Sequence, residues 1–150
     1  MKAVVQRVSE ATLRVDGAVR AEVTAPGGLV VLVGLDEEDV PADRTWLAEK
    51  VVNLRIFPDE AGKMNKSVID IGGTVMLVPN FTVAGDARKG RRPSFDRAMK
   101  PEQAEGEFDA LVEAVRAIHP KVSRGVFRAH MHVSLVNDGP VTILLDSRAQ

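Results

Sequence analysis

The sequence predicts an α/β fold in which a curled, barrel-like sheet of mixed or antiparallel strands packs against two main helices. Two continuous apolar runs, Leu29–Leu35 and Thr74–Val78, are typical of strands buried on both faces. Two segments that open on proline carry apolar residues at helical spacing, and several shorter segments alternate with period two. The 150 residues, 45% of them hydrophobic, show no linker-like stretch, so we expect one domain over residues 1–150.

The first quarter of the chain predicts a strand followed by a hairpin. Lys2–Val8 is strand-like, and the segments Thr12–Val15 and Ala18–Val23 alternate apolar and polar residues. Asp16-Gly17 between them is a strong two-residue hairpin signal. A turn at Pro26-Gly27-Gly28 then leads into the first apolar run.

Both helices are predicted by their start signals and their apolar spacing. Acidic residues followed by Pro41 predict a helix over residues 41–53. Pro101-Glu102 predicts the start of a second helix, and Pro120 predicts its end. One face of this second helix has apolar residues at i, i+3, i+4 and i+7 and is expected to pack on the sheet: Phe108, Leu111, Val112 and Val115.

The closing strands are expected over Val126–Val136 and Val141–Leu145, with Asn137-Asp138-Gly139-Pro140 between them. Asn, Asp and Gly tolerate positive φ, and proline fixes its own φ and removes a donor. The tetrapeptide is therefore either an ordinary hairpin turn or a stiff wedge held between two strands. Physical chemistry alone favours the hairpin turn.

Composition and charge limit the classes of function. The chain has no cysteine, which excludes disulfides and thiol chemistry and fits the cytosol. It begins without a signal-peptide pattern and has no apolar run of about 18 residues, so no membrane association is expected. With a net charge of −1, it can bind nucleic acid only through a local patch or by shape.

The one basic cluster is Arg88-Lys89-Gly90-Arg91-Arg92, in a segment rich in Gly and Pro. A phosphate-binding loop and a solvated surface loop are equally good interpretations of it. A second candidate, Pro79-Asn80-Phe81-Thr82, follows a predicted buried strand, where binding residues often lie. Its amide, ring and hydroxyl suit an ester or an adenine, and the alternative is a capped loop with Phe81 in the core. His130 and His132 lack metal-ligand partners, so we expect neither a metal nor a cofactor.

Five motifs occur in an order that resembles the D-aminoacyl-tRNA deacylase family, over residues 1 to about 145. The resemblance implies the fold of that family and a homodimeric cytoplasmic enzyme that frees a D-amino acid and tRNA from their ester. It also implies activity on glycyl-tRNA and a pocket at the dimer interface. The motifs are Gln6-Arg7-Val8, Arg55-Ile56-Phe57 with Gly62-Lys63-Met64-Asn65, Phe81-Thr82, Arg92-Pro93-Ser94-Phe95 and Asn137-Asp138-Gly139-Pro140-Val141-Thr142.

The resemblance also implies roles for individual residues. Gly139-Pro140 is implied to be cis and to enter the partner's pocket, where it excludes L-amino acids, with Arg7 bracing it. Met131 is implied to lie near the adenosine. The catalytic site is implied at Asn80, Phe81 and Thr82, with Thr82 not required as a nucleophile because the ester is already activated. The basic cluster, through Lys89, Arg91 and Arg92, is expected to contact tRNA phosphates.

Two positions depart from the family pattern. Pro79-Asn80 stands where Ser-Gln is usual, and His130 stands where an acidic residue is common. The first departure removes a backbone donor and a hydroxyl and shortens an amide arm by one methylene. This departure leads to one alternative, a tRNA-binding proofreading relative with altered or relaxed selectivity. A separate and weaker alternative is an esterase that acts on small D-amino-acid esters.

Overall fold

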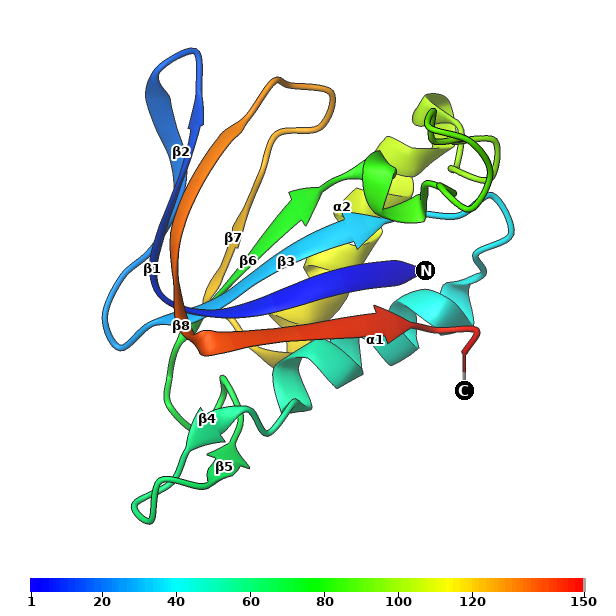
Figure 1. The fold of residues 1–150 in the computed structure, drawn as a ribbon. Coiled ribbons are helices and arrows are strands. Elements are labelled where there is room, and N and C mark those ends of the chain that lie inside the picture. Colours follow the sequence, from blue (N-terminus) through cyan, green and yellow to red (C-terminus); the bar gives the residue numbers. More distant parts are fainter. Residues whose placement is uncertain (150) are drawn as a thin grey trace.

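The computed structural model describes residues 1–149 and shows a strongly curled mixed sheet with two helices on one face (Figure 1). The strand order is β2-β1-β3-β6-β7, and β8 pairs with β1. β3, β6 and β7 run parallel, whereas β1 is antiparallel to each of its neighbours. The predicted fold class is confirmed. The elements are β1 (Lys2–Val15), β2 (Ala18–Val23), β3 (Gly28–Gly34), α1 (Pro41–Asn53), β4 (Phe57–Pro58), β5 (Met64–Lys66), β6 (Thr74–Pro79), η1 (Phe81–Ala84), α2 (Pro101–Ile118), β7 (Val122–Arg124) and β8 (His132–Asp146).

The two strands expected over residues 2–8 and 12–15 are one bent strand, β1. Its first half pairs with β3, from Lys2↔Gly34 to Val8↔Gly28, and its second half pairs with β2. Register shifts near Val8 let the strand bend as it changes neighbours. The predicted hairpin at Asp16-Gly17 is confirmed, because both residues have positive φ, 51° and 77°.

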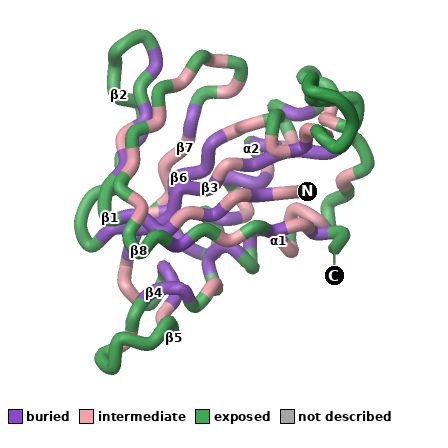
Figure 2. Tube along the Cα trace, in the orientation of Figure 1, coloured by how far each residue is buried: buried purple, intermediate pink, exposed green. Residues whose placement is uncertain are grey.

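The residues of β3 are almost all buried (Figure 2), which agrees with the continuous apolar run, and its side chains enter two cores. Leu29, Val31 and Val33 belong to the core between the sheet and the helices, whereas Val30 and Leu32 face a second core inside the curl of the sheet. Both helices begin at the predicted prolines, and the predicted apolar face of α2 is buried in the first core. None of the helices in residues 1–149 has the length and apolarity that a membrane crossing requires.

The predicted closing strands are wrong in two respects. Residues 125–131 form no strand, and Val126 is 39% exposed, so the apolar residues there do not mark a buried strand. Asn137-Asp138-Gly139-Pro140 does not reverse the chain either: β8 pairs with β1 on both sides of it, with Val8↔Asn137 and Gln6↔Thr142. Between these pairs, residues 138–141 of β8 loop out from β1, and this segment is called the excursion below. The hairpin interpretation is therefore wrong.

Gly28 fixes the spacing of β3 and β6 where the two strands begin. A Cβ at this position would lie 1.9 Å from the Thr74 carbonyl oxygen, which belongs to the paired residue of β6. We expect Gly28→Ala to lower the free energy of unfolding in urea by more than about 3 kcal/mol, because backbone must move to admit the methyl group. The control is Gly106→Ala in α2, where no atom lies within 4 Å of the added Cβ. It should stabilise the chain by about 0.5–1 kcal/mol. Equal effects of the two changes would contradict the prediction.

Candidate functional site

A cavity of about 860 Å³ opens at the C-terminal ends of the parallel strands β3 and β6. Its wall combines residues from the ends of these strands with residues from the start of α2 and from the segment before β8. Adjacent parallel strands end at one edge of a sheet, where the loops beyond them commonly form ligand sites. The wall is mainly apolar, and its apolar members include Leu32, Leu35, Val78, Phe95, Met99 and Phe127.

Asn80 and Phe81, predicted at the site, both line this cavity. The Asn80 backbone N–H donates to the Val33 carbonyl over 2.8 Å, which continues the pairing of β6 with β3. The Thr82 hydroxyl donates to Asn80 Oδ1 over 2.5 Å. Phe81 is 60% exposed and touches Phe95 edge-on, with ring centroids 5.1 Å apart. The alternative that placed Phe81 in the core is therefore wrong.

Met131 lies in the wall of the same cavity, so the fold brings it together with Asn80 and Phe81. The closeness depends on Gly125, where an added Cβ would lie 2.9 Å from Met131 Sδ and 3.0 Å from Pro79 Cδ. His130 also lines the cavity and contacts the His132 ring edge-on. Within residues 1–149, no three His, Asp or Glu side chains are grouped as metal ligands would be.

The basic cluster projects from the rim of the cavity. Asp86 and Ser94 pair through two backbone hydrogen bonds of 2.8 and 2.9 Å, and Phe95, directly after this stem, lines the cavity. The Arg88 side chain donates to the Asp86 carboxylate, which lowers the pKa of Asp86 well below its usual range. Arg88 is thus neutralised locally. The cations that the sequence assigned to phosphates are exposed beyond the stem: Lys89, Arg91 and Arg92.

One side chain of β8 itself, Asn137, and one side chain of β1, Arg7, hold the Gly139-Pro140 excursion of β8. The Asn137 side chain closes its base, accepting from the Val141 N–H over 2.7 Å and donating to the Val141 carbonyl over 3.2 Å. Arg7, only 8% exposed, donates from Nε to the Asp138 carbonyl over 2.8 Å and from Nη1 to the Ile56 carbonyl over 2.6 Å. The peptide bond between Gly139 and Pro140 is cis, and both residues are exposed.

The structure does not bring Gly139-Pro140 to the cavity of its own chain. Asn137 pairs with Val8, and Val8 pairs with Gly28 at the beginning of β3. The cavity begins at Leu32, near the other end of β3. At about 3.3 Å per residue, the four to six residues from Gly28 to Leu32 and to the end of β3 separate the excursion from the cavity by roughly 13–20 Å along the strand.

Three polar residues at these sites are given no individual role from the sequence. Lys100 and Arg128 line the cavity, and Asn137 clamps the base of the excursion. Asn137 belongs to a recognisable Asn-Asp-Gly signal, so its tendency to bond to nearby backbone was available from sequence. Lys100 and Arg128 belong to no local pattern, because only the packing of α2 beside the segment before β8 brings them together.

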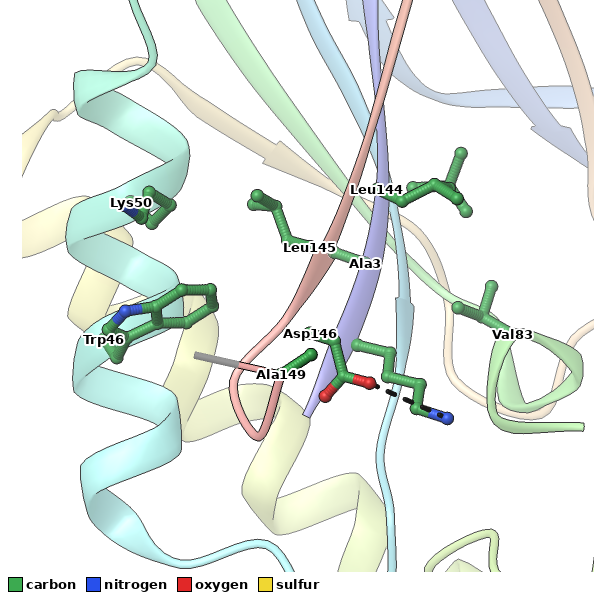
Figure 3. Close-up of a pocket in the computed structure, with 10 residues that line it drawn as sticks. Ala3, Trp46, Lys50, Val83, Leu144, Leu145, Asp146 and Ala149 are labelled. Carbon is green, nitrogen blue, oxygen red and sulfur yellow. Dashed lines mark ion pairs between the residues drawn. The ribbon is translucent and has the colours of Figure 1, made fainter.

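A second hollow of about 850 Å³ lies between α1 and the strands β1 and β8. In Figure 3, Leu145 points toward Trp46 of α1 and Leu144 points to the other side of β8, as neighbouring residues of a strand do. Leu144 is 76% exposed. Lys2 Nζ lies 4.0 Å from Asp146 Oδ2. None of the side chains expected at the catalytic site lines this hollow.

The curled mixed sheet with two helices on one face is an α/β fold that solved proteins share. A solved structure described as a probable eukaryotic D-amino acid tRNA deacylase superposes with a TM-score of 0.79, covering 96% of this chain and 97% of its own at 15% identity, which shows the fold alone. The c-Myc DNA unwinding element binding protein superposes with a TM-score of 0.92 at 40% identity, covering 97% of this chain and 98% of its own.

The sequence model of the D-Tyr-tRNA(Tyr) deacylase family matches residues 4–146, and the chain belongs to this family. The D-aminoacyl-tRNA deacylase of Kosmotoga olearia is 56% identical over 151 residues, covering 100% of this chain and 99% of the relative. That of Koribacter versatilis is 50% identical over 150 residues, with the same coverage. The resemblance found in the sequence is confirmed.

Proposed function

We propose that this protein hydrolyses the ester between a D-amino acid and the 3′-terminal adenosine of tRNA, releasing both in the cytoplasm. The observation that carries the proposal is the cavity at the strand ends, in a chain closely related to D-aminoacyl-tRNA deacylases. Its volume of about 860 Å³ suits an aminoacyl nucleoside. Phe81 presents an exposed ring at its edge, on which a base can stack.

We further propose a homodimer in which each subunit completes the other's site. Gly139-Pro140 lies roughly 13–20 Å along the strand from the cavity of its own chain, so only a second copy can supply it there. Two observations support insertion into a partner. Both residues are exposed, and Arg7 and Asn137 hold the excursion from inside the molecule.

Gly139-Pro140 then acts as a steric barrier rather than as a chemical group. Enantiomers have equal volume, so chirality is read only by a rigid wall on one side of Cα. The proline ring has a fixed φ, and the excursion is bonded at Asn137 and Asp138. An L side chain would collide with this wall, whereas a D side chain points away from it. A glycyl ester has no side chain, so we propose that glycyl-tRNA is also hydrolysed.

The chemical step needs a positioned water and a polarised carbonyl. The Thr82 hydroxyl donates to Asn80 Oδ1. This bond fixes the orientation of the amide, so the two N–H donors of Asn80 Nδ2 point away from Thr82. We propose that they donate to the ester carbonyl. Water attacks the carbonyl carbon and loses a proton, and the tetrahedral intermediate breaks its bond to the ribose oxygen, which takes up that proton. Thr82 positions Asn80 and need not attack the substrate.

Hydrolysis of D- and L-aminoacyl-tRNA by the purified protein tests the proposal. The rate for the D-ester should exceed that for the L-ester by at least about 100-fold, which corresponds to about 2.7 kcal/mol. Equal rates at catalytic amounts of protein would contradict it. Equal turnover of a D-amino-acid methyl ester, undiminished by replacing Lys89, Arg91 and Arg92, would favour the small-molecule esterase instead.

The departure at Pro79-Asn80 carries a second prediction. Asn80 lines the cavity, and its amide lies one methylene closer to the backbone than that of glutamine. If this departure relaxes selectivity, Pro79→Ser combined with Asn80→Gln should raise the ratio of D to L rates by about 10-fold, or about 1.4 kcal/mol. Asn80→Gln alone separates the amide arm from the proline. An unchanged ratio in the double variant would exclude altered selectivity through these positions.

A further inference from the structure

Two cations outside the basic cluster lie in the wall of the cavity. Lys100 immediately precedes α2, and Arg128 lies in the segment before β8. Arg128 Nη2 is 3.7 Å from the carboxylate of Glu102, which is in the first turn of α2, two residues beyond Lys100. The two positive charges therefore share one part of the cavity rim, although 28 positions separate them in the sequence.

Both cations are held loosely by their carboxylate partners. Lys100 Nζ lies 3.7 Å from Glu37 Oε1, and neither this contact nor that of Arg128 with Glu102 is short enough for a hydrogen bond. The side chains of Lys100 and Arg128 are 71% and 62% exposed. Exposed pairs of this kind contribute little, so an incoming anion can replace the carboxylates without a large penalty.

The backbone conformation of Arg128 is a second observation that indicates a ligand site. Its φ is 60°, in the left-handed region that glycine and asparagine adopt more readily than arginine. Strained positions of this kind in natural proteins cluster at ligand sites. The chain thus holds an arginine at the cavity rim in a conformation that its own preferences disfavour.

We propose that Lys100 and Arg128 bind the 5′-phosphate of the terminal nucleotide, the anion nearest to the ester. The inference rests on the proposed function, because a nucleoside ester inside the cavity must leave by the rim with its phosphate attached. Arginine offers a planar fork to phosphate oxygens, and lysine a compact charge. Lys89, Arg91 and Arg92, beyond the Asp86–Ser94 stem, then serve more distant phosphates.

Two minimal substrates isolate this contact: the D-aminoacyl ester of adenosine and the same ester of adenosine 5′-monophosphate. The full-length wild-type protein should hydrolyse the phosphorylated ester with a kcat/KM about 10-fold higher, mainly through a lower KM. Lys100→Met with Arg128→Gly should abolish this advantage, so that the variant hydrolyses the two esters with equal kcat/KM. Arg128→Gly also suits the positive φ, so folding is not at risk.

The matched control is Lys89→Met with Arg91→Met, which should keep the advantage of the phosphorylated ester and weaken hydrolysis of full-length D-aminoacyl-tRNA. Equal kcat/KM values for the two esters in the wild type, or an advantage that survives Lys100→Met with Arg128→Gly, would overturn the phosphate site. Failure to hydrolyse any D-ester would overturn the proposed function instead. In that case, the Kd values of adenosine 5′-monophosphate and adenosine, measured by titration, test the phosphate site separately. Equal Kd values for the two ligands would overturn the site. A roughly 10-fold lower Kd for the phosphorylated ligand, lost in Lys100→Met with Arg128→Gly, would support it.

Discussion

Replacing Gly139 by alanine is expected to lower the ratio of D to L hydrolysis rates by about 100-fold, because small displacements of positioning groups have effects of this size. Gly139 has φ 142°, a conformation that side chains rarely adopt. An added Cβ would lie 2.7 Å from Val141 Cγ2 and 3.2 Å from Arg7 Nη2. The excursion must therefore shift, and the barrier to L-amino acids shifts with it. The measurement is the rate of amino-acid release from D- and L-aminoacyl-tRNA.

Gly62→Ala is the matched control for Gly139→Ala. Gly62 also has a positive φ, 77°, but no atom lies within 4 Å of an added Cβ. The Gly62→Ala change therefore introduces backbone strain without a steric collision, at an exposed turn between β4 and β5. The D to L ratio of this control should equal that of the wild type. If Gly139→Ala also kept the wild-type ratio, Gly139 would not belong to the selectivity barrier.

Replacing Arg7 by alanine should weaken both the fold and the selectivity. The change leaves the carbonyl oxygens of Ile56 and Asp138 without their charged donor, and the first of these bonds is buried. Loss of such bonds should lower the free energy of unfolding by about 2–4 kcal/mol. The D to L ratio should fall as well, because the excursion loses the brace that joins it to the segment before β4. Urea unfolding and the two hydrolysis rates measure the two effects.

Two further variants separate these effects. Arg7→Lys keeps the charge, but a single ammonium cannot replace the two arms of the guanidinium, so intermediate losses are expected. Arg14→Ala, on the same strand, removes only an exposed bond to the Gly17 carbonyl and should change the free energy of unfolding by less than about 0.5 kcal/mol. A destabilised Arg7→Ala protein with an unchanged D to L ratio would show that Arg7 supports the fold and not the barrier.

Much of the fold was predictable because its signals are local. Pro41 and Pro101 mark the first residues of α1 and α2, and the apolar spacing within residues 101–118 identified the face of α2 that is buried. Asp16-Gly17 predicted its hairpin, because positive φ at both positions is a property of those two residues. The ordered motifs sufficed to identify the family, and the resemblance implied site roles for Asn80, Phe81 and Met131, which the fold brings to one cavity.

Strand pairing was decided by the tertiary structure, because pairing depends on neighbours remote in sequence. No local signal shows that both sides of Asn137-Asp138-Gly139-Pro140 pair with β1, which turns an apparent hairpin into an excursion of β8. The same pairing places Gly139-Pro140 at the beginning of β3 and the cavity at its end. The sequence by itself thus determined the family and the helices, and it predicted site residues that remain to be tested by hydrolysis measurements. Only tertiary packing decided that the excursion and the cavity lie apart in one chain and that Lys100 and Arg128 share a rim.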